Sequence, residues 1–118
     1  MEIKVLELGN IGTNCYLIKG ETGAVVIDPG FDCDEVREFL TENAHKEKMI
    51  ILTHSHFDHI GAAPLLRELT DTKIAIGTLD NPALADVNIN LSLLFGCDLA
   101  PFSADILLNG GDEYRLVI

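Results

Sequence analysis

The sequence is poor in basic residues and in long hydrophobic runs. Only 8 lysines and arginines stand against 19 aspartates and glutamates in 118 residues, and the formal net charge is −11. A field of this sign repels phosphate backbones, so we expect no nucleic-acid partner. The longest apolar runs, such as 24–27 and 49–52, are far shorter than a membrane span, so we expect no membrane partner either.

Cysteines are few and widely spaced. Cys15, Cys33 and Cys97 form no Cys-x-x-Cys pair, which argues against a cysteine-clamped zinc site and against a thiol redox motif. We interpret them as small buried or half-buried thiols. The N-terminus lacks the basic start and long apolar stretch of a secretion signal, and we expect a cytoplasmic protein.

The hydrophobic pattern predicts an α/β fold with a mixed sheet and flanking helices. Strands alternate with helices after an antiparallel start, which is the order typical of an α/β layer. We expect Leu65, Leu66 and Leu69 to face inward on the second helix, with Pro64 in its first turn. The predicted strands are 2–8, 15–19, 24–28, 49–52 and 73–77, and the predicted helices are 34–43 and 60–69.

The last third of the sequence is less regular. Residues 80–103 contain short apolar pieces punctuated by Asn, Pro and Gly, and the pattern allows brief helices or an ordered loop. Residues 106–108, the turn 109–112 and residues 114–118 predict a hairpin. Because the sequence stops inside an apolar run, we expect residues 1–118 to be one domain cut short at its C-terminus, whose exposed edge at Val117 and Ile118 pairs with a second copy in a homodimer.

The most informative segment is Thr53-His54-Ser55-His56-Phe57-Asp58-His59, directly after the predicted buried strand 49–52. Alternation in an extended segment would place His54, His56 and Asp58 on one side, with His59 entering from the following helix. A lone His-x-His pair is more often a chance cluster on a polar loop. Here three of the four histidines of the chain fall within six positions around an acid, and neutral imidazoles with a carboxylate are the ligands that zinc accepts.

This motif resembles the metal-binding motif of the metallo-β-lactamase superfamily. Residues 14–18 and 26–30 upstream, and residues 90–95 and 108–112 downstream, are similar to glyoxalase II-like members, the hydroxyacylglutathione hydrolases. The resemblance implies that this chain is the N-terminal half of a four-layer αββα sandwich. It also implies that the third histidine of the first metal, a bridging aspartate and a further histidine of the second metal come from positions beyond Ile118.

The resemblance also implies roles for individual residues. His54 and His56 would bind one metal, and Asp58 with His59 would bind the second; Asp28 would support the site from beneath. Asp28 can equally be read as an Asp-Pro turn former, and Gly61 either as a close-packing position or as a simple helix-start glycine. Two zinc ions per complete site are favoured, although iron and manganese also suit such ligands.

The implied function is hydrolysis of a small-molecule thioester by a metal-bound hydroxide, with Asp58 as the catalytic residue that orients the water and accepts a proton. Because this chain supplies only part of the site, we expect weak metal binding and little turnover from it alone. Two alternatives stay open. One is a persulfide dioxygenase or another iron-dependent redox member of the superfamily, and the other is a non-catalytic metal-binding or interaction domain.

Overall fold

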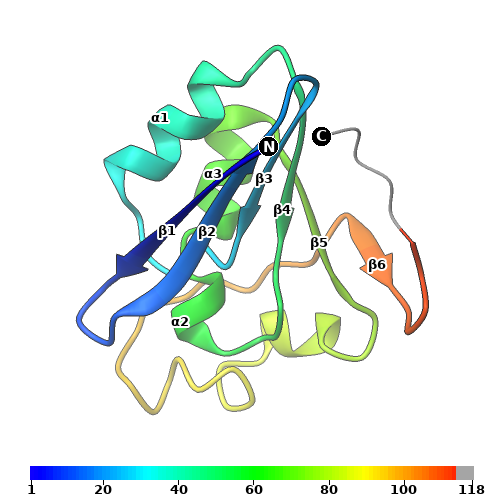
Figure 1. Ribbon diagram of the computed structural model, residues 1–118. Coiled ribbons are helices and arrows are strands. Elements are labelled where there is room, and N and C mark those ends of the chain that lie inside the picture. Colours follow the sequence, from blue (N-terminus) through cyan, green and yellow to red (C-terminus); the bar gives the residue numbers. More distant parts are fainter. Residues whose placement is uncertain (114–118) are drawn as a thin grey trace.

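A six-stranded mixed sheet forms the centre of the structure, a computed structural model that describes residues 1–113 (Figure 1). The strands lie in the sheet in their sequence order; β1, β2 and β3 pair antiparallel, and β3 to β6 pair parallel. The elements are β1 (Glu2–Leu8), β2 (Thr13–Lys19), β3 (Gly23–Ile27), α1 (Asp34–Glu42), β4 (Glu47–Ile51), α2 (Phe57–Ile60), α3 (Ala63–Thr70), β5 (Lys73–Gly77), the 3-10 helix η1 (Asn81–Ala85) and β6 (Ile106–Leu108).

The predicted α/β class is confirmed, and each predicted strand outside the final hairpin is present within two residues of its expected bounds. The predicted helix 60–69 is instead two helices, α2 and α3, joined at Gly61 and Ala62. β6 pairs in parallel with β5, while the second arm of the predicted hairpin lies outside the described residues, as does the predicted edge at Val117 and Ile118. None of the helices in residues 1–113 is long and apolar enough to cross a membrane.

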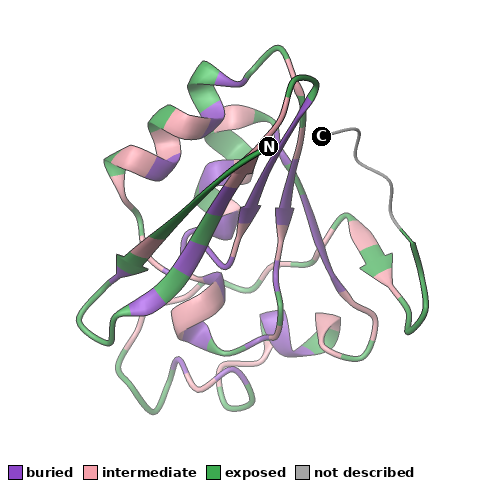
Figure 2. Cartoon of the chain, in the orientation of Figure 1, coloured by how far each residue is buried: buried purple, intermediate pink, exposed green. Residues whose placement is uncertain are grey.

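The hydrophobic core lies between the sheet and the helices α1 and α3. Alternation along β2 buries Cys15 and Leu17 and exposes Tyr16, as expected for a strand covered on one face (Figure 2). The core side chains from the central strands and the two helices form one cluster, whose members include Val26, Ile50, Ile74, Val36, Leu40 and Leu66. Burial of this cluster fixes α1 and α3 against the sheet.

Helix α3 differs from the sequence prediction in the face that it buries. Leu66 is buried with Ala63, whereas Leu65 and Leu69 are 37% and 54% exposed. Ala63 and Leu66 are three residues apart, so they lie on the same face of the helix, the one that packs against the sheet. Leu65 and Leu69 are four residues apart and share a neighbouring face. The prediction that all three leucines face inward is therefore wrong for two of them.

The sheet face opposite the helices is also apolar. Ile3, Val5 and Tyr16 lie on it, and each is at least 36% exposed. A sheet with helices on one face leaves its other face for another layer. The half-sandwich that the family resemblance implies, with a second layer on this face, stays a prediction.

The sheet topology sets the position of the candidate site. β3 and β4 are adjacent and parallel, with Ile27 opposite Ile51, so their carboxyl ends meet at one edge of the sheet. Asp28 follows β3 directly, and Thr53 with His54 follow β4. Ligand sites of α/β sheets lie at this edge, and the side chains described below gather there.

Candidate metal centre

Asp28 is the buried anchor of the site, with 4% of its surface exposed. Its Oδ1 accepts a hydrogen bond from the backbone N–H of Thr53 at 2.8 Å, and its Oδ2 accepts one from the Thr53 hydroxyl at 2.6 Å. The backbone of Asp28 has a φ of +56°, which is uncommon outside glycine but tolerated by aspartate. These hydrogen bonds join the ends of β3 and β4 and hold Asp28 in that conformation.

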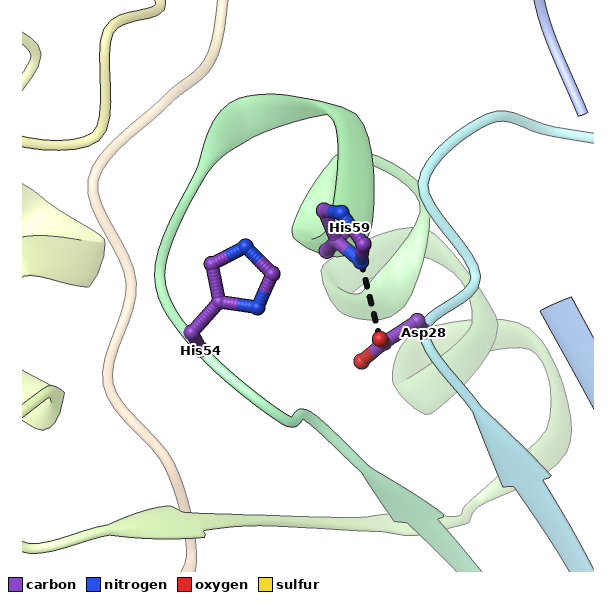
Figure 3. Close-up of side chains that lie close together, drawn as sticks. All are labelled: Asp28, His54 and His59. Atoms are coloured by element: carbon purple, nitrogen blue, oxygen red, sulfur yellow. Dashed lines mark hydrogen bonds and ion pairs between the residues drawn. The ribbon is translucent and has the colours of Figure 1, made fainter. Parts of the chain in front are cut away.

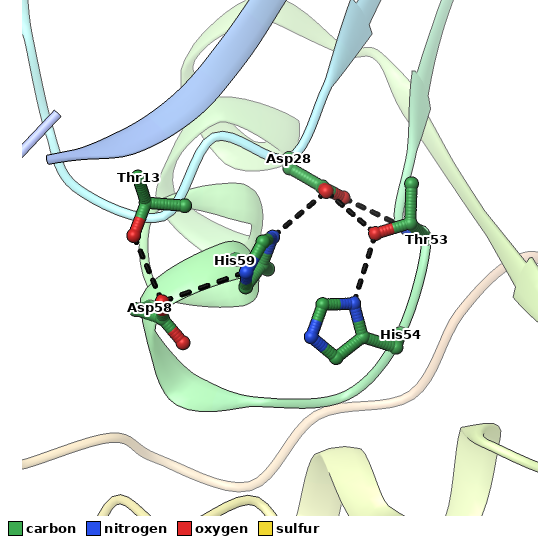
Figure 4. Close-up of polar contacts among 6 residues, drawn as sticks. All are labelled: Thr13, Asp28, Thr53, His54, Asp58 and His59. Atoms are coloured by element: carbon green, nitrogen blue, oxygen red, sulfur yellow. Dashed lines mark hydrogen bonds and ion pairs between the residues drawn. The ribbon is translucent and has the colours of Figure 1, made fainter. Parts of the chain in front are cut away.

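Two imidazoles are oriented by this anchor (Figures 3 and 4). Nδ1 of His59 lies 2.8 Å from Oδ2 of Asp28, and Nδ1 of His54 lies 2.9 Å from Oγ1 of Thr53. Since the Thr53 hydroxyl gives its only hydrogen to Asp28, its oxygen accepts the Nδ1–H of His54, and the carboxylate of Asp28 accepts the Nδ1–H of His59. In both rings Nε2 is then unprotonated, and its lone pair is free to bind a metal.

The structure brings three potential metal ligands together: Asp28, His54 and His59 each place one possible ligand atom within 4.8 Å of those of the other two (Figure 3). The ring centroids of the two histidines are 4.1 Å apart. Both oxygens of Asp28 are already used by donors from Thr53 and His59. This is the arrangement expected of a supporting carboxylate, so the free Nε2 atoms are the better ligands.

Asp58 lies beside His59 in α2, with its Oδ2 at 3.5 Å from the Nε2 of His59. Two ligands at about 2.0–2.1 Å from a tetrahedral zinc are roughly 3.4 Å apart, so this pair has the spacing of two ligands of one ion. The hydroxyl of Thr13, at the start of β2, donates to the same Oδ2 at 2.8 Å (Figure 4). Because α2 begins at Phe57, Asp58 is helical and does not continue the extended alternation predicted from the sequence.

His56 occupies the residue before α2 and is exposed. Its ring centroid lies 4.7 Å from that of His54, but His56 is outside the group formed by Asp28, His54 and His59. The pairing of His54 with His56 around one metal, and of Asp58 with His59 around a second, stays a prediction.

Helix α2 and the residue after it lie unusually close to the chain after β3, because Gly30 and Gly61 have no side chains at this contact. A Cβ on Gly61 would lie 2.2 Å from the carbonyl oxygen of Gly30, and a Cβ on Gly30 would lie 1.6 Å from the carbonyl oxygen of Asp58. Both glycines are therefore required for close backbone approach. The close-packing interpretation of Gly61 agrees with this contact, whereas for its partner Gly30 the sequence predicted only a turn after the strand 24–28.

The loop after η1 supports α2 from its other end. The backbone N–H of Phe57 donates to the carbonyl oxygen of Asn90 at 2.8 Å, and the rings of Phe57 and Phe95 stack with centroids 4.8 Å apart. Asn90 is 1% exposed and its amide donates to the carbonyl oxygen of Ala83 at 3.0 Å. The irregular segment 80–103 thus includes an ordered loop that holds the start of α2.

The surroundings of His54 favour its neutral form. Partial burial lowers the pKa of His54, and the neighbouring rings of His59 and His56 lower it further. A metal requires the neutral imidazole, so this shift reduces competition from protons near neutral pH. Two imidazoles with free Nε2 atoms and a flanking carboxylate are a donor set that fits a divalent metal such as zinc.

Thr13, Thr53 and Asn90 were not identified as site residues from the sequence. Thr53 is the first residue of the histidine motif, so its position directly before His54 was a usable signal. Thr13 and Asn90 come from distant segments, and no local pattern links them to α2.

Comparison with known proteins places the chain in a family. A family model described as the metallo-beta-lactamase superfamily matches residues 8–115. The chain is 30% identical over 117 residues to the probable metallo-hydrolase YqgX of Bacillus subtilis, covering 98% of this chain and 56% of that protein. It is 35% identical over 69 residues to the hydroxyacylglutathione hydrolase GloC of Haemophilus influenzae, covering 58% of this chain and 32% of that protein.

A solved structure shows the same fold. The crystal structure of BLEG-1 B3 metallo-beta-lactamase superposes with a TM-score of 0.84 at 31% identity, over 98% of this chain and 57% of that one. The chain therefore spans little more than half the length of YqgX and BLEG-1. The match of the family model over nearly all of the sequence shows that the chain belongs to the metallo-beta-lactamase superfamily.

Proposed function

We propose that this chain carries the first half of the active site of a metal-dependent hydrolase that cleaves small-molecule thioesters of the hydroxyacylglutathione type. The observation that carries the proposal is the tether of His54 and His59 through Nδ1, which leaves both Nε2 atoms free beside Asp58. The partial similarity to GloC supports a thioester substrate. Zinc is the proposed metal, because imidazole and carboxylate ligands suit it.

Each residue has a distinct role in this proposal. Asp28 fixes the orientation of His59 directly and that of His54 through the Thr53 hydroxyl. When bound, the metal ions supply Lewis acidity and lower the pKa of water. In residues 1–113 no hydrogen bond reaches Oδ1 of Asp58, so this oxygen is available to accept a proton from the water that attacks the acyl carbon.

The test is hydrolysis of a 2-hydroxyacyl thioester of glutathione by zinc-loaded protein, measured as thiol release. We expect weak turnover from residues 1–118 and stronger turnover from any longer product of the same gene. His59→Ala should abolish turnover in both, whereas His45→Ala, which changes an exposed histidine, should leave it intact. Absence of zinc-dependent thiol release from the longer product would refute the proposal.

A second candidate reaction is hydrolysis of a β-lactam amide. It is favoured by the similarity to BLEG-1, which is named a B3 metallo-beta-lactamase. A chromogenic β-lactam assayed beside the thioester separates the two, since the preferred substrate has the higher kcat/KM. One iron per chain together with dioxygen consumption would instead favour a redox member, and a melting temperature unchanged by chelation would favour a non-catalytic domain.

A further inference from the structure

Thr13 is a buried polar residue whose partner belongs to the metal centre. It is the first residue of β2, where it pairs with Leu8 of β1, and 7% of its surface is exposed. Its hydroxyl donates to Oδ2 of Asp58 at 2.8 Å across a separation of 45 residues. An ionised carboxylate can only accept, so the hydrogen of this bond comes from Thr13.

The hydrogen bond selects one position for the Asp58 carboxylate. Asp58 lies on a four-residue helix with its side chain 18% exposed, so without a partner it could turn toward solvent. In the described structure Oδ2 is held by Thr13 and lies 3.5 Å from Nε2 of His59. The threonine therefore keeps the carboxylate on the same side as the free ring nitrogen.

We propose that Thr13 is a positioning residue, whose hydroxyl holds the Asp58 carboxylate beside Nε2 of His59 so that both bind one divalent cation. Groups that hold ligands in place change metal affinity by about 10-fold to 100-fold when they are removed. The inference rests on the metal centre of the proposed function, but it concerns metal affinity and does not depend on the substrate.

The experiment measures zinc affinity by competition with a chelating dye. Thr13→Val keeps the shape of the side chain and removes the hydroxyl, and we expect zinc affinity to fall about 10-fold or more. Thr13→Ser restores the donor and should bind zinc as wild type does. Should the valine variant fail to fold, Thr13→Ala removes the same hydroxyl without adding bulk.

A matched control separates positioning from general stability. Thr72 is 1% exposed and its hydroxyl pairs with that of Thr70 at 2.7 Å, next to the amino end of β5 and so away from the site. Thr72→Val should lower the melting temperature without changing zinc affinity. An equal loss of zinc affinity in Thr72→Val and Thr13→Val would overturn the proposal.

A double-mutant cycle tests whether Thr13 changes zinc affinity through Asp58. In an Asp58→Ala background, Thr13→Val should cause no further loss of zinc affinity, because its partner is already gone. An additional loss in that background, or wild-type affinity in Thr13→Val alone, would show that Thr13 does not act through Asp58. If the wild-type chain binds no zinc, the metal centre and this proposal both fail; zinc binding without thioester hydrolysis refutes the substrate assignment alone.

Discussion

Substitution of Gly30 by alanine should damage both the fold and the metal centre. The added Cβ would lie 1.6 Å from the carbonyl oxygen of Asp58 and 2.4 Å from its carbonyl carbon. Such contacts in proteins are essentially never shorter than 3.0 Å, so α2 or the chain after β3 must move by more than 1 Å. Both partners are backbone, and neither can rotate away as a flexible side chain would.

The size of this displacement predicts losses of both stability and zinc affinity. Overpacking a buried contact typically costs about 1–3 kcal/mol, and a clash between two backbones belongs at or above the upper end, so we expect the free energy of unfolding to fall by about 3 kcal/mol. Metal sites tolerate ligand errors of only about 0.2 Å. A shift of α2 by more than 1 Å carries Asp58 and His59 with it, and zinc affinity should fall with stability.

The assay is urea unfolding in metal-free buffer together with a zinc titration. Gly110→Ala is the matched control, because a Cβ on Gly110 meets nothing within 4 Å, and its stability should stay within about 0.5 kcal/mol of wild type. If Gly30→Ala unfolds at the same urea concentration as wild type and binds zinc equally well, the close approach of α2 to the chain after β3 is not a feature of the protein in solution.

The same structure makes predictions for Asp28, His56 and Cys15. Asp28→Asn should weaken zinc binding and lower the free energy of unfolding by about 1–3 kcal/mol, because the amide cannot accept from Thr53 and His59 as the carboxylate does; an unchanged urea midpoint would contradict this. His56→Ala should weaken zinc binding if His56 shares a metal with His54, while unchanged zinc affinity would remove it from the ligand set. Burial, aided by the charges of Asp28 and Cys33, raises the pKa of the Cys15 thiol from 9.0 to about 12, so Cys15 should resist alkylation at pH 8 until the protein is unfolded. The thiol of the unfolded chain loses its proton at lower pH than the thiol of the folded protein. The free energy of unfolding should therefore be unaffected by this group below pH 9 and fall by about 1.4 kcal/mol by pH 10, and Cys15→Ala should not show this loss.

The sequence predicted the parts of this site that depend on local pattern. Buried strands ending at Asp28 and before His54 are visible as apolar runs, and their parallel pairing brings the two residues to one edge of the sheet. The identity of the family could also be predicted, because the histidine motif is compact and its residue types are specific.

The contacts that orient the ligands could not be predicted in the same way. The hydrogen bond from Thr13 to Asp58 joins residues 45 positions apart, and its partners depend on how α2 packs against β2. Helix α2 begins at Phe57 because the loop around Asn90 receives its first N–H, and this long-range contact replaced the predicted extended alternation. The leucine pattern of α3 likewise fits more than one stripe, and only packing decides which stripe is buried.

The central claim is that Asp28 and Thr53 hold His54 and His59 with their Nε2 atoms directed at a shared metal centre. Crystals of the protein grown with excess zinc and measured at the zinc absorption edge test it most directly. We predict anomalous density at about 2.0–2.1 Å from the Nε2 atoms, with Nδ1 of each ring still hydrogen-bonded to Thr53 or Asp28. Rings turned away into solvent, with no anomalous density between them, would contradict it.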